Sequence, residues 1–186
     1  MDGKTSPSTS RLTALSFHPT DDEIIMYLKR MVCGGPINCH YIDEKNVNTL
    51  EPWDLLAQSF GNSGIQEWYL FSIPHINQGI YRATDQGYWK VTNNDGQAIE
   101  GNSGIIGFKK NLAFYVGHAP NGEKTDWIMH EYRLVDKDLA KNGYALDTFV
   151  LCKVFQEQYS RPESSEQSGV LIMRDETDTK ETYNEE

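Results

Sequence analysis

Apolar positions near the start of the chain recur with the period of an α-helix. Ile24 and Leu28 lie on one helical face, and Thr20 and Glu23 have the spacing of a capping box. The Gly-Gly-Pro run at 34–36 ends the pattern, because neither residue type continues a helix readily. The sequence therefore predicts a helix over residues 21–32. Pro52 suits the first turn of a second, short helix over 52–58.

After residue 67 the pattern changes to short runs rich in aromatic and β-branched residues, which is typical of strands. Asn121-Gly122 is a turn signal, and no stretch between successive runs fits a long helix, so an antiparallel sheet is favoured over βαβ units. The predicted strands are EWYLFS (67–72), GYWKVT (87–92), IIGFKK (105–110), LAFYV (112–116), TDWIMHEYRL (125–134) and TFVLCKVF (148–155).

Composition divides the chain into one folded part and two tails. Residues 1–10 are small and polar, and residues 157–186 are acidic and poor in aromatic side chains, so we expect both to be disordered or loosely attached. The folded part is predicted to be a single domain over residues 11–156. Since no apolar run approaches the length of a membrane span, we expect no membrane segment and an intracellular protein.

The charge of the chain is unevenly distributed. The formal net charge is −10, which argues against a nucleic-acid binder, because affinity for DNA rests largely on lysine and arginine. Residues 157–186 carry −6 of this charge, so the remaining 156 residues carry only −4. Residues 65–133 contain six bases and seven acids, and a net charge does not say which face the acids occupy.

Enzyme and metal chemistry find little support in the sequence. Cys33, Cys39 and Cys152 are odd in number and unevenly spaced, which indicates reduced thiols and neither a disulfide framework nor a zinc site. The run HEYRL at 130–134 begins like a zinc-protease helix, but Leu134 stands where the second histidine is required. No nucleophile elbow or phosphate loop is present, so we expect no enzyme, cofactor or metal.

Five sequence blocks occur in a characteristic order along the chain. They are Phe17-His18-Pro19-Thr20-Asp21 with Glu23, Glu51-Pro52-Trp53-Asp54-Leu55, EWYLFS at 67–72, Gly87-Tyr88-Trp89-Lys90 and KTDWIMHEYRL at 124–134. With these blocks the sequence resembles the NAC domain of plant transcription factors over nearly all of its predicted folded part.

The resemblance implies an α+β fold, a twisted antiparallel β-sheet flanked by a few helices. It also implies dimerisation through the N-terminal segment, residence in the nucleus, and a strand edge around Trp89-Lys90 in the major groove of double-stranded DNA with a CGT-type core.

The resemblance also indicates which residues contact DNA. Lys90 is expected at or near the base edges, since Trp89 is expected in the core and neighbouring strand residues point to opposite faces. The same alternation places Lys109 and Lys110 on different faces, and the run 126–134 is expected to build the sheet without a contact. The predicted short polar contacts are Thr92, Asn93 and Asn94, and the predicted phosphate contacts are Arg82, Lys109, Lys110 and Lys124.

The sequence departs from the family pattern at several positions. Ser16 replaces an arginine that pairs across the dimer with a glutamate matching Glu23, so the usual pairing is lost. Asp85 lies near the expected DNA face, and Gly96 and Asn121 stand where lysines are usual. The candidate dimerisation residues are Arg11, Leu12, Leu15, Ser16 and Glu23.

Two functions of different classes follow from these features. The first is a sequence-specific DNA-binding domain of a plant transcription regulator, acting as a homodimer or as a heterodimer with other NAC proteins. The second is an interaction module that keeps the fold, binds DNA weakly and pairs with other transcription factors. Ser16, Asp85, Gly96 and Asn121 favour the second function.

Overall fold

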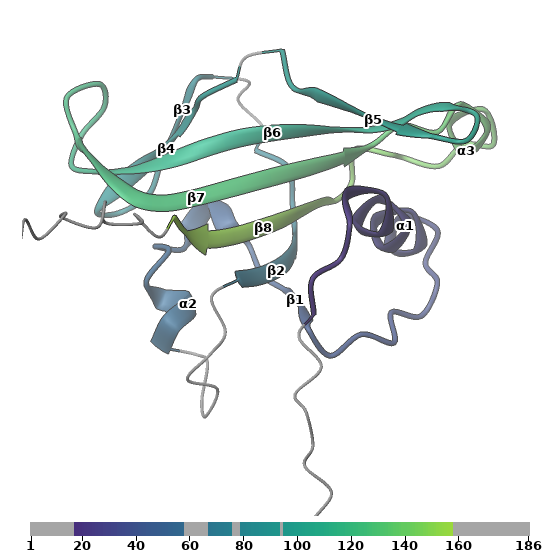
Figure 1. Cartoon of the computed structure of the whole chain (residues 1–186), viewed down its shortest axis with the longest axis horizontal. Coiled ribbons are helices and arrows are strands. Elements are labelled where there is room, and N and C mark those ends of the chain that lie inside the picture. The colour runs from purple at the N-terminus through teal and green to yellow at the C-terminus, as the bar shows by residue number, and fades with distance from the viewer. Residues whose placement is uncertain (1–16, 58–66, 76–78, 94, 158–186) are drawn as a thin grey trace, which may run out of the picture.

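A computed structural model describes residues 17–57, 67–75, 79–93 and 95–157 (Figure 1). The helices are α1 (Asp21–Val32), the 3-10 helix η1 (Val47–Thr49), α2 (Asp54–Ala57) and α3 (Lys137–Lys141). The strands are β1 (Ile42–Glu44), β2 (Glu67–Ser72), β3 (Tyr81–Ala83), β4 (Gly87–Val91), β5 (Gln97–Gly101), β6 (Gly104–Val116), β7 (Glu123–Leu134) and β8 (Val150–Gln156).

The described strands form one eight-stranded sheet in the order β1-β2-β8-β7-β6-β4-β3, with β5 paired to β6 outside this path. The predicted α+β class is therefore confirmed. The antiparallel prediction holds for every pair of described strands except β1 and β2, which are parallel. A parallel pair requires a crossover connection, and η1 and α2 lie in the segment that joins these two strands.

Strand β6 is longer than the sequence predicts. The runs 105–110 and 112–116 were expected as two strands, but the structure joins them through Asn111 into the single strand Gly104–Val116. The backbone of Asn111 pairs on both sides, because it is the register partner of His130 in β7 and its carbonyl accepts a hydrogen bond from the Thr92 N–H at 2.9 Å. A polar side chain thus interrupts the hydrophobic pattern without interrupting the strand.

Helix α1 has the predicted bounds and covers one face of the sheet (Figure 1). Glu23 Oε2 accepts a hydrogen bond from the Thr20 N–H at 2.9 Å, as a capping box requires. Ile24, Ile25 and Leu28 are buried in one hydrophobic cluster between α1 and the sheet. We call this side of the sheet the helix face.

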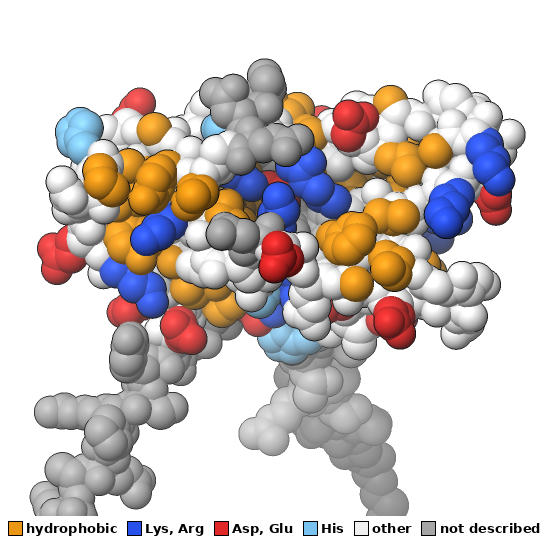
Figure 2. Space-filling view, turned by 90° about the horizontal axis from the view of Figure 1, so that it is seen from above, with side chains coloured by type: hydrophobic (Ala, Val, Ile, Leu, Met, Phe, Trp, Pro, Cys, Tyr) orange, Lys and Arg blue, Asp and Glu red, His pale blue; other side chains and the backbone are white. Residues whose placement is uncertain are grey.

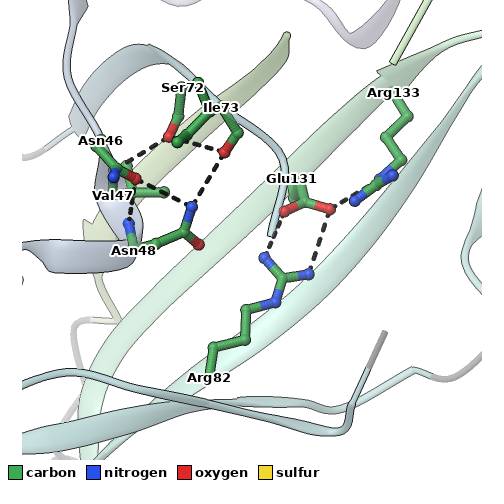
Figure 3. Close-up of polar contacts among 8 residues, drawn as sticks. All are labelled: Asn46, Val47, Asn48, Ser72, Ile73, Arg82, Glu131 and Arg133. Carbon is green, nitrogen blue, oxygen red and sulfur yellow. Dashed lines mark hydrogen bonds and ion pairs between the residues drawn. The ribbon is translucent and has the colours of Figure 1, made fainter. Parts of the chain in front are cut away.

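The opposite side of the sheet carries the second hydrophobic cluster, which includes Trp89, Phe114, Trp127 and Met129. We call it the tryptophan face. The segment around η1 is fixed to β2 by side chains: Ser72 Oγ accepts from the Val47 N–H at 3.1 Å (Figure 3). Among the described residues, no helix is long and apolar enough to cross a membrane.

Strand β8 ends at Gln156, and the Glu157 N–H donates to the Asp126 carbonyl at 2.8 Å, which continues the pairing of β7 and β8. Apart from Glu157, the predicted tails over 1–10 and 157–186 lie outside the described residues.

Candidate nucleic-acid interface

Strand β4 places Trp89 and Lys90 on opposite faces, as strand alternation predicts. Trp89 is 2% exposed and packs edge-on against Phe114, with ring centroids 5.0 Å apart. Lys90 is only partly buried, and its Nζ lies 5.5 Å from the ring centroid of Tyr115 and 6.0 Å from that of Tyr81. The aromatic rings therefore support a lysine that stands on the helix face.

The resemblance implies that a strand edge around Trp89-Lys90 enters the groove. In the structure β4 is paired on both sides, with Arg82 of β3 opposite Trp89 and Phe114 of β6 opposite Trp89 on the other side. Strand β3 is therefore the edge of the described sheet, and β4 ends at Val91, whose N–H donates to the Ile80 carbonyl at 2.9 Å. The loop that follows Val91 begins two residues after Lys90.

Thr92 and Asn93, which follow β4, are held to β6 by hydrogen bonds. The Thr92 hydroxyl donates to the Asn111 carbonyl at 3.0 Å, and Asn93 Oδ1 accepts from the Asn111 N–H at 2.6 Å. Gly96 closes the loop with a φ of 66°, a left-handed conformation that favours glycine. Both predicted polar contacts thus also hold the loop in place, while Asn94 lies outside the described residues.

The structure brings some of the predicted lysines together and separates others. Lys124 is exposed and is the register partner of Tyr115, so Lys90 and Lys124 stand beside the same ring on the helix face. Lys110 is partly exposed on the tryptophan face, opposite Glu131 of β7. The Lys109 Nζ lies 2.6 Å from Asp21 Oδ2 with a side chain only 14% exposed, so it joins β6 to α1.

Arg82 is buried, unlike the surface cation that the sequence predicts. It is 5% exposed, and its guanidinium donates to both carboxylate oxygens of Glu131, with Nη2 3.3 Å from Oε1 (Figure 3). Burial by itself raises the pKa of the Glu131 carboxyl, but the hydrogen bond and charge of Arg82 together with the charge of Arg133 outweigh it, so the pKa lies below its ordinary value. This arrangement argues against a phosphate contact by Arg82.

Arg133 is a partly exposed cation that was not among the predicted DNA contacts. Its Nε lies 3.0 Å from Glu131 Oε1, yet its side chain is 36% exposed. The run 126–134 was expected to make no contact, but alternation from Trp127 already places Arg133 on the tryptophan face with Lys110.

Viewed from the side on which β3, β4 and β6 lie in Figure 1, Lys and Arg side chains gather at the middle of the surface, between hydrophobic groups (Figure 2).

The predicted dimerisation residues fall mostly outside the described part of the chain, which does not include Arg11, Leu12, Leu15 or Ser16. Glu23 is described; it is exposed on α1 and is engaged in the helix cap with Thr20. Within the described ranges, no group of three or more His, Cys, Asp and Glu side chains is arranged to hold a metal ion.

The described residues form an α+β domain built on one eight-stranded sheet. The family model described as "No apical meristem (NAM) protein" matches residues 12–134. The chain belongs to this family, the NAC domain family, which confirms the resemblance seen in the sequence.

Three relatives illustrate the similarity. NAC domain-containing protein 53 of Arabidopsis thaliana is 44% identical over 173 residues, which is 90% of this chain and 31% of that protein. NAC domain-containing protein 78 of the same plant is 42% identical over 173 residues, 90% of this chain and 30% of its own length. NAC domain containing protein 52 is 42% identical over 168 residues, 87% of this chain and 37% of its own length. The chain therefore spans about a third of the curated relatives that it matches.

Proposed function

We propose that this chain binds double-stranded DNA in a sequence-specific manner as the DNA-binding domain of a plant transcription factor. The observation that carries the proposal is the position of Lys90, which stands on the helix face beside Lys124 while the adjacent Trp89 is locked in the core. Membership of the NAC domain family supports the same function. Residence in the nucleus, dimerisation and the absence of enzyme activity belong to this proposal.

The loop after β4 and its neighbouring cations suit the major groove. Each base pair shows a distinct pattern of donors, acceptors and methyl groups there, and a strand and its loop fit the width of the groove. Lys90, Thr92 and Asn93 are the proposed reading residues, with Asn94 retained from the sequence prediction. Lys124 on the helix face, and Lys110 and Arg133 on the tryptophan face, are the proposed phosphate contacts, which fix the register without reading sequence.

The test is a fluorescence anisotropy titration against a labelled duplex with a CGT-type core and against a shuffled duplex, at several salt concentrations. We expect preferential binding of the first duplex, and Lys90→Ala is expected to reduce both the preference and the affinity. Lys137→Ala is the matched control, since Lys137 is an exposed lysine on α3 outside the proposed interface. Equally weak binding of both duplexes would instead support an interaction module that keeps the fold.

A further inference from the structure

The buried ion pair of Arg82 and Glu131 joins two strands that are not neighbours. Arg82 belongs to β3 and Glu131 to β7, and β4 and β6 lie between these strands in the sheet. Both side chains are almost completely buried, at 6% and 1% exposed. The pair therefore crosses the tryptophan face and ties the edge of the sheet to its centre (Figure 3).

The strand that this pair holds is a short strand at the edge of the described sheet. Strand β3 has three residues and pairs with β4 alone, with Arg82 directly opposite Trp89. Such an edge strand has backbone pairing on one side only, so side-chain contacts contribute to holding it in place. The pair is thus placed to fix the β3–β4 hairpin, from which Lys90 and the loop after Val91 extend.

A second carboxylate holds the turn of the same hairpin. Glu51 is 5% exposed, its Oε2 accepts from the Thr84 hydroxyl at 2.9 Å, and its Oε1 accepts from the Gln86 N–H at 2.7 Å. Two buried acids therefore fix the hairpin, although acids near a DNA-binding surface ordinarily oppose binding.

We infer that Arg82 and Glu131 are positioning residues for DNA recognition: they fix the β3–β4 hairpin so that Lys90 and the following loop are presented to the groove. This inference rests on the proposed function and adds to it a role for an acidic residue, Glu131. It gives Arg82 a positioning role in place of the phosphate contact that the sequence predicts. Positioning and phosphate contact predict opposite effects on DNA affinity when the charge of Glu131 is removed.

Glu131→Gln separates these roles. If Arg82 contacted phosphate, removal of a neighbouring negative charge would strengthen DNA binding and steepen its dependence on salt. If Arg82 positions the hairpin, the variant binds the CGT-type duplex at least about fivefold more weakly, as expected when base readout is disturbed. Binding of the shuffled duplex is then not weakened, because no phosphate contact is lost, and the release of Arg133 from Glu131 strengthens phosphate contact whichever role Arg82 has. Tighter binding of the CGT-type duplex overturns the inference.

Two further variants serve as controls. Glu123→Gln removes an exposed acid near Lys124 and is expected to leave binding unchanged or slightly tighter, so it reports the purely electrostatic effect. Arg82→Lys keeps the positive charge but loses the planar fork that meets both oxygens of a carboxylate. We expect Arg82→Lys to behave like Glu131→Gln; wild-type binding by Arg82→Lys contradicts the inference.

Hydrogen exchange tests the positioning without DNA. The N–H groups of Thr84 and Val91 report the hairpin, since they donate to the carbonyls of Gly87 and Ile80, both at 2.9 Å. The N–H of Lys45, which donates to the Phe71 carbonyl at 2.9 Å, reports the distant β1–β2 end. In Glu131→Gln we expect faster exchange at Thr84 and Val91 and unchanged exchange at Lys45. Equal acceleration at all three sites indicates a general loss of stability and overturns the inference.

The two experiments also separate this inference from the proposed function. If the wild-type protein does not distinguish the duplexes, the proposed function fails. The exchange rates still decide whether the ion pair holds the hairpin: unchanged rates at Thr84 and Val91 in Glu131→Gln refute that role.

Discussion

Gly87 begins strand β4 at a point where the structure leaves no space for a side chain. A Cβ atom added at Gly87 would lie 2.2 Å from the Tyr115 carbonyl oxygen and 2.6 Å from Cζ of Phe114. Phe114 is fully buried, and Tyr115 belongs to the central strand β6, so neither atom moves without disturbing the core. The Gly87→Ala variant therefore requires β4 and β6 to separate at this point.

The cost is estimated from the effects of overpacking. Forcing an extra carbon into a packed core typically costs about 1–3 kcal/mol, and contact with a backbone atom and a buried ring places Gly87→Ala near about 3 kcal/mol. Glycine loses more backbone freedom on folding than alanine, which offsets this loss by roughly 0.4–1 kcal/mol. We expect a net decrease of about 2 kcal/mol or more in the free energy of unfolding.

Urea unfolding followed by tryptophan fluorescence measures this decrease, with Gly79→Ala as the matched control. A Cβ at Gly79 would meet its nearest neighbouring atom, the Tyr81 carbonyl oxygen, at 3.6 Å, which is an ordinary contact. We expect Gly79→Ala to be neutral or slightly stabilising. Wild-type stability of Gly87→Ala, or equal losses in the two variants, would refute the steric reasoning.

Three further predictions concern stability. Burial, together with two nearby lysines, lowers the pKa of His130 in the folded chain to about 4. As the pH falls, His130 is therefore protonated in the unfolded chain at a higher pH than in the folded chain. The free energy of unfolding should fall as the pH drops from about 6.5 to 4, by on the order of 1 kcal/mol after allowance for solvent screening, and His130→Phe should remove this part of the pH dependence. Ser72→Ala leaves the buried Val47 N–H without its acceptor and should cost about 1–3 kcal/mol in urea unfolding. Glu51→Gln replaces one of the two carboxylate oxygens that accept at the β3–β4 turn by an NH2 group, so the Thr84 hydroxyl loses its acceptor; it should cost about 1 kcal/mol, with faster hydrogen exchange at the Gly87 N–H, which donates to that hydroxyl.

Each of these predictions has a clear contradiction. An unchanged pH profile in His130→Phe would mean that His130 keeps its ordinary pKa in the folded chain. A Ser72→Ala variant with wild-type stability would mean that the Val47 N–H finds another acceptor. If Glu51→Gln alters the exchange of the β1–β2 amides as much as that of Gly87, Glu51 does not act locally on the turn.

Local patterns predicted much of the fold. The capping box and the apolar period of α1 depend on residues within one helical turn, and both agree with the structure. Alternation in β4 placed Trp89 and Lys90 on opposite faces correctly, since it needs only two neighbouring residues. The short strands β1, β3 and β5 escaped prediction because three to five residues carry too weak a periodic signal.

The candidate interface was harder to predict because it depends on residues that are distant in sequence. Arg82 was expected at the surface on its residue type, and only the assembled sheet shows that its guanidinium reaches Glu131 of β7. Lys109 was expected to contact phosphate, but Asp21 of α1 lies against it. Arg133 could have been found from the alternation of β7, once one face of that strand was known to be partly open.

The distribution of charge limits how this surface would bind DNA in the proposed function. Within the described part of residues 65–133, Arg82, Lys109 and Glu131 are engaged in ion pairs and their side chains are largely buried. The accessible cations are then Lys90, Lys110, Lys124 and Arg133, and they are accompanied by exposed acids at positions 85, 95, 100, 123 and 126. Under the proposed function, attraction by net charge therefore contributes little, and four accessible cations give a salt slope of at most about 4 per chain, at roughly 0.9 per phosphate neutralised. DNA binding by such a surface would depend on the placement of a few side chains, so the proposed role of the buried anchors of the β3–β4 hairpin predicts a larger effect from their loss than from added lysines.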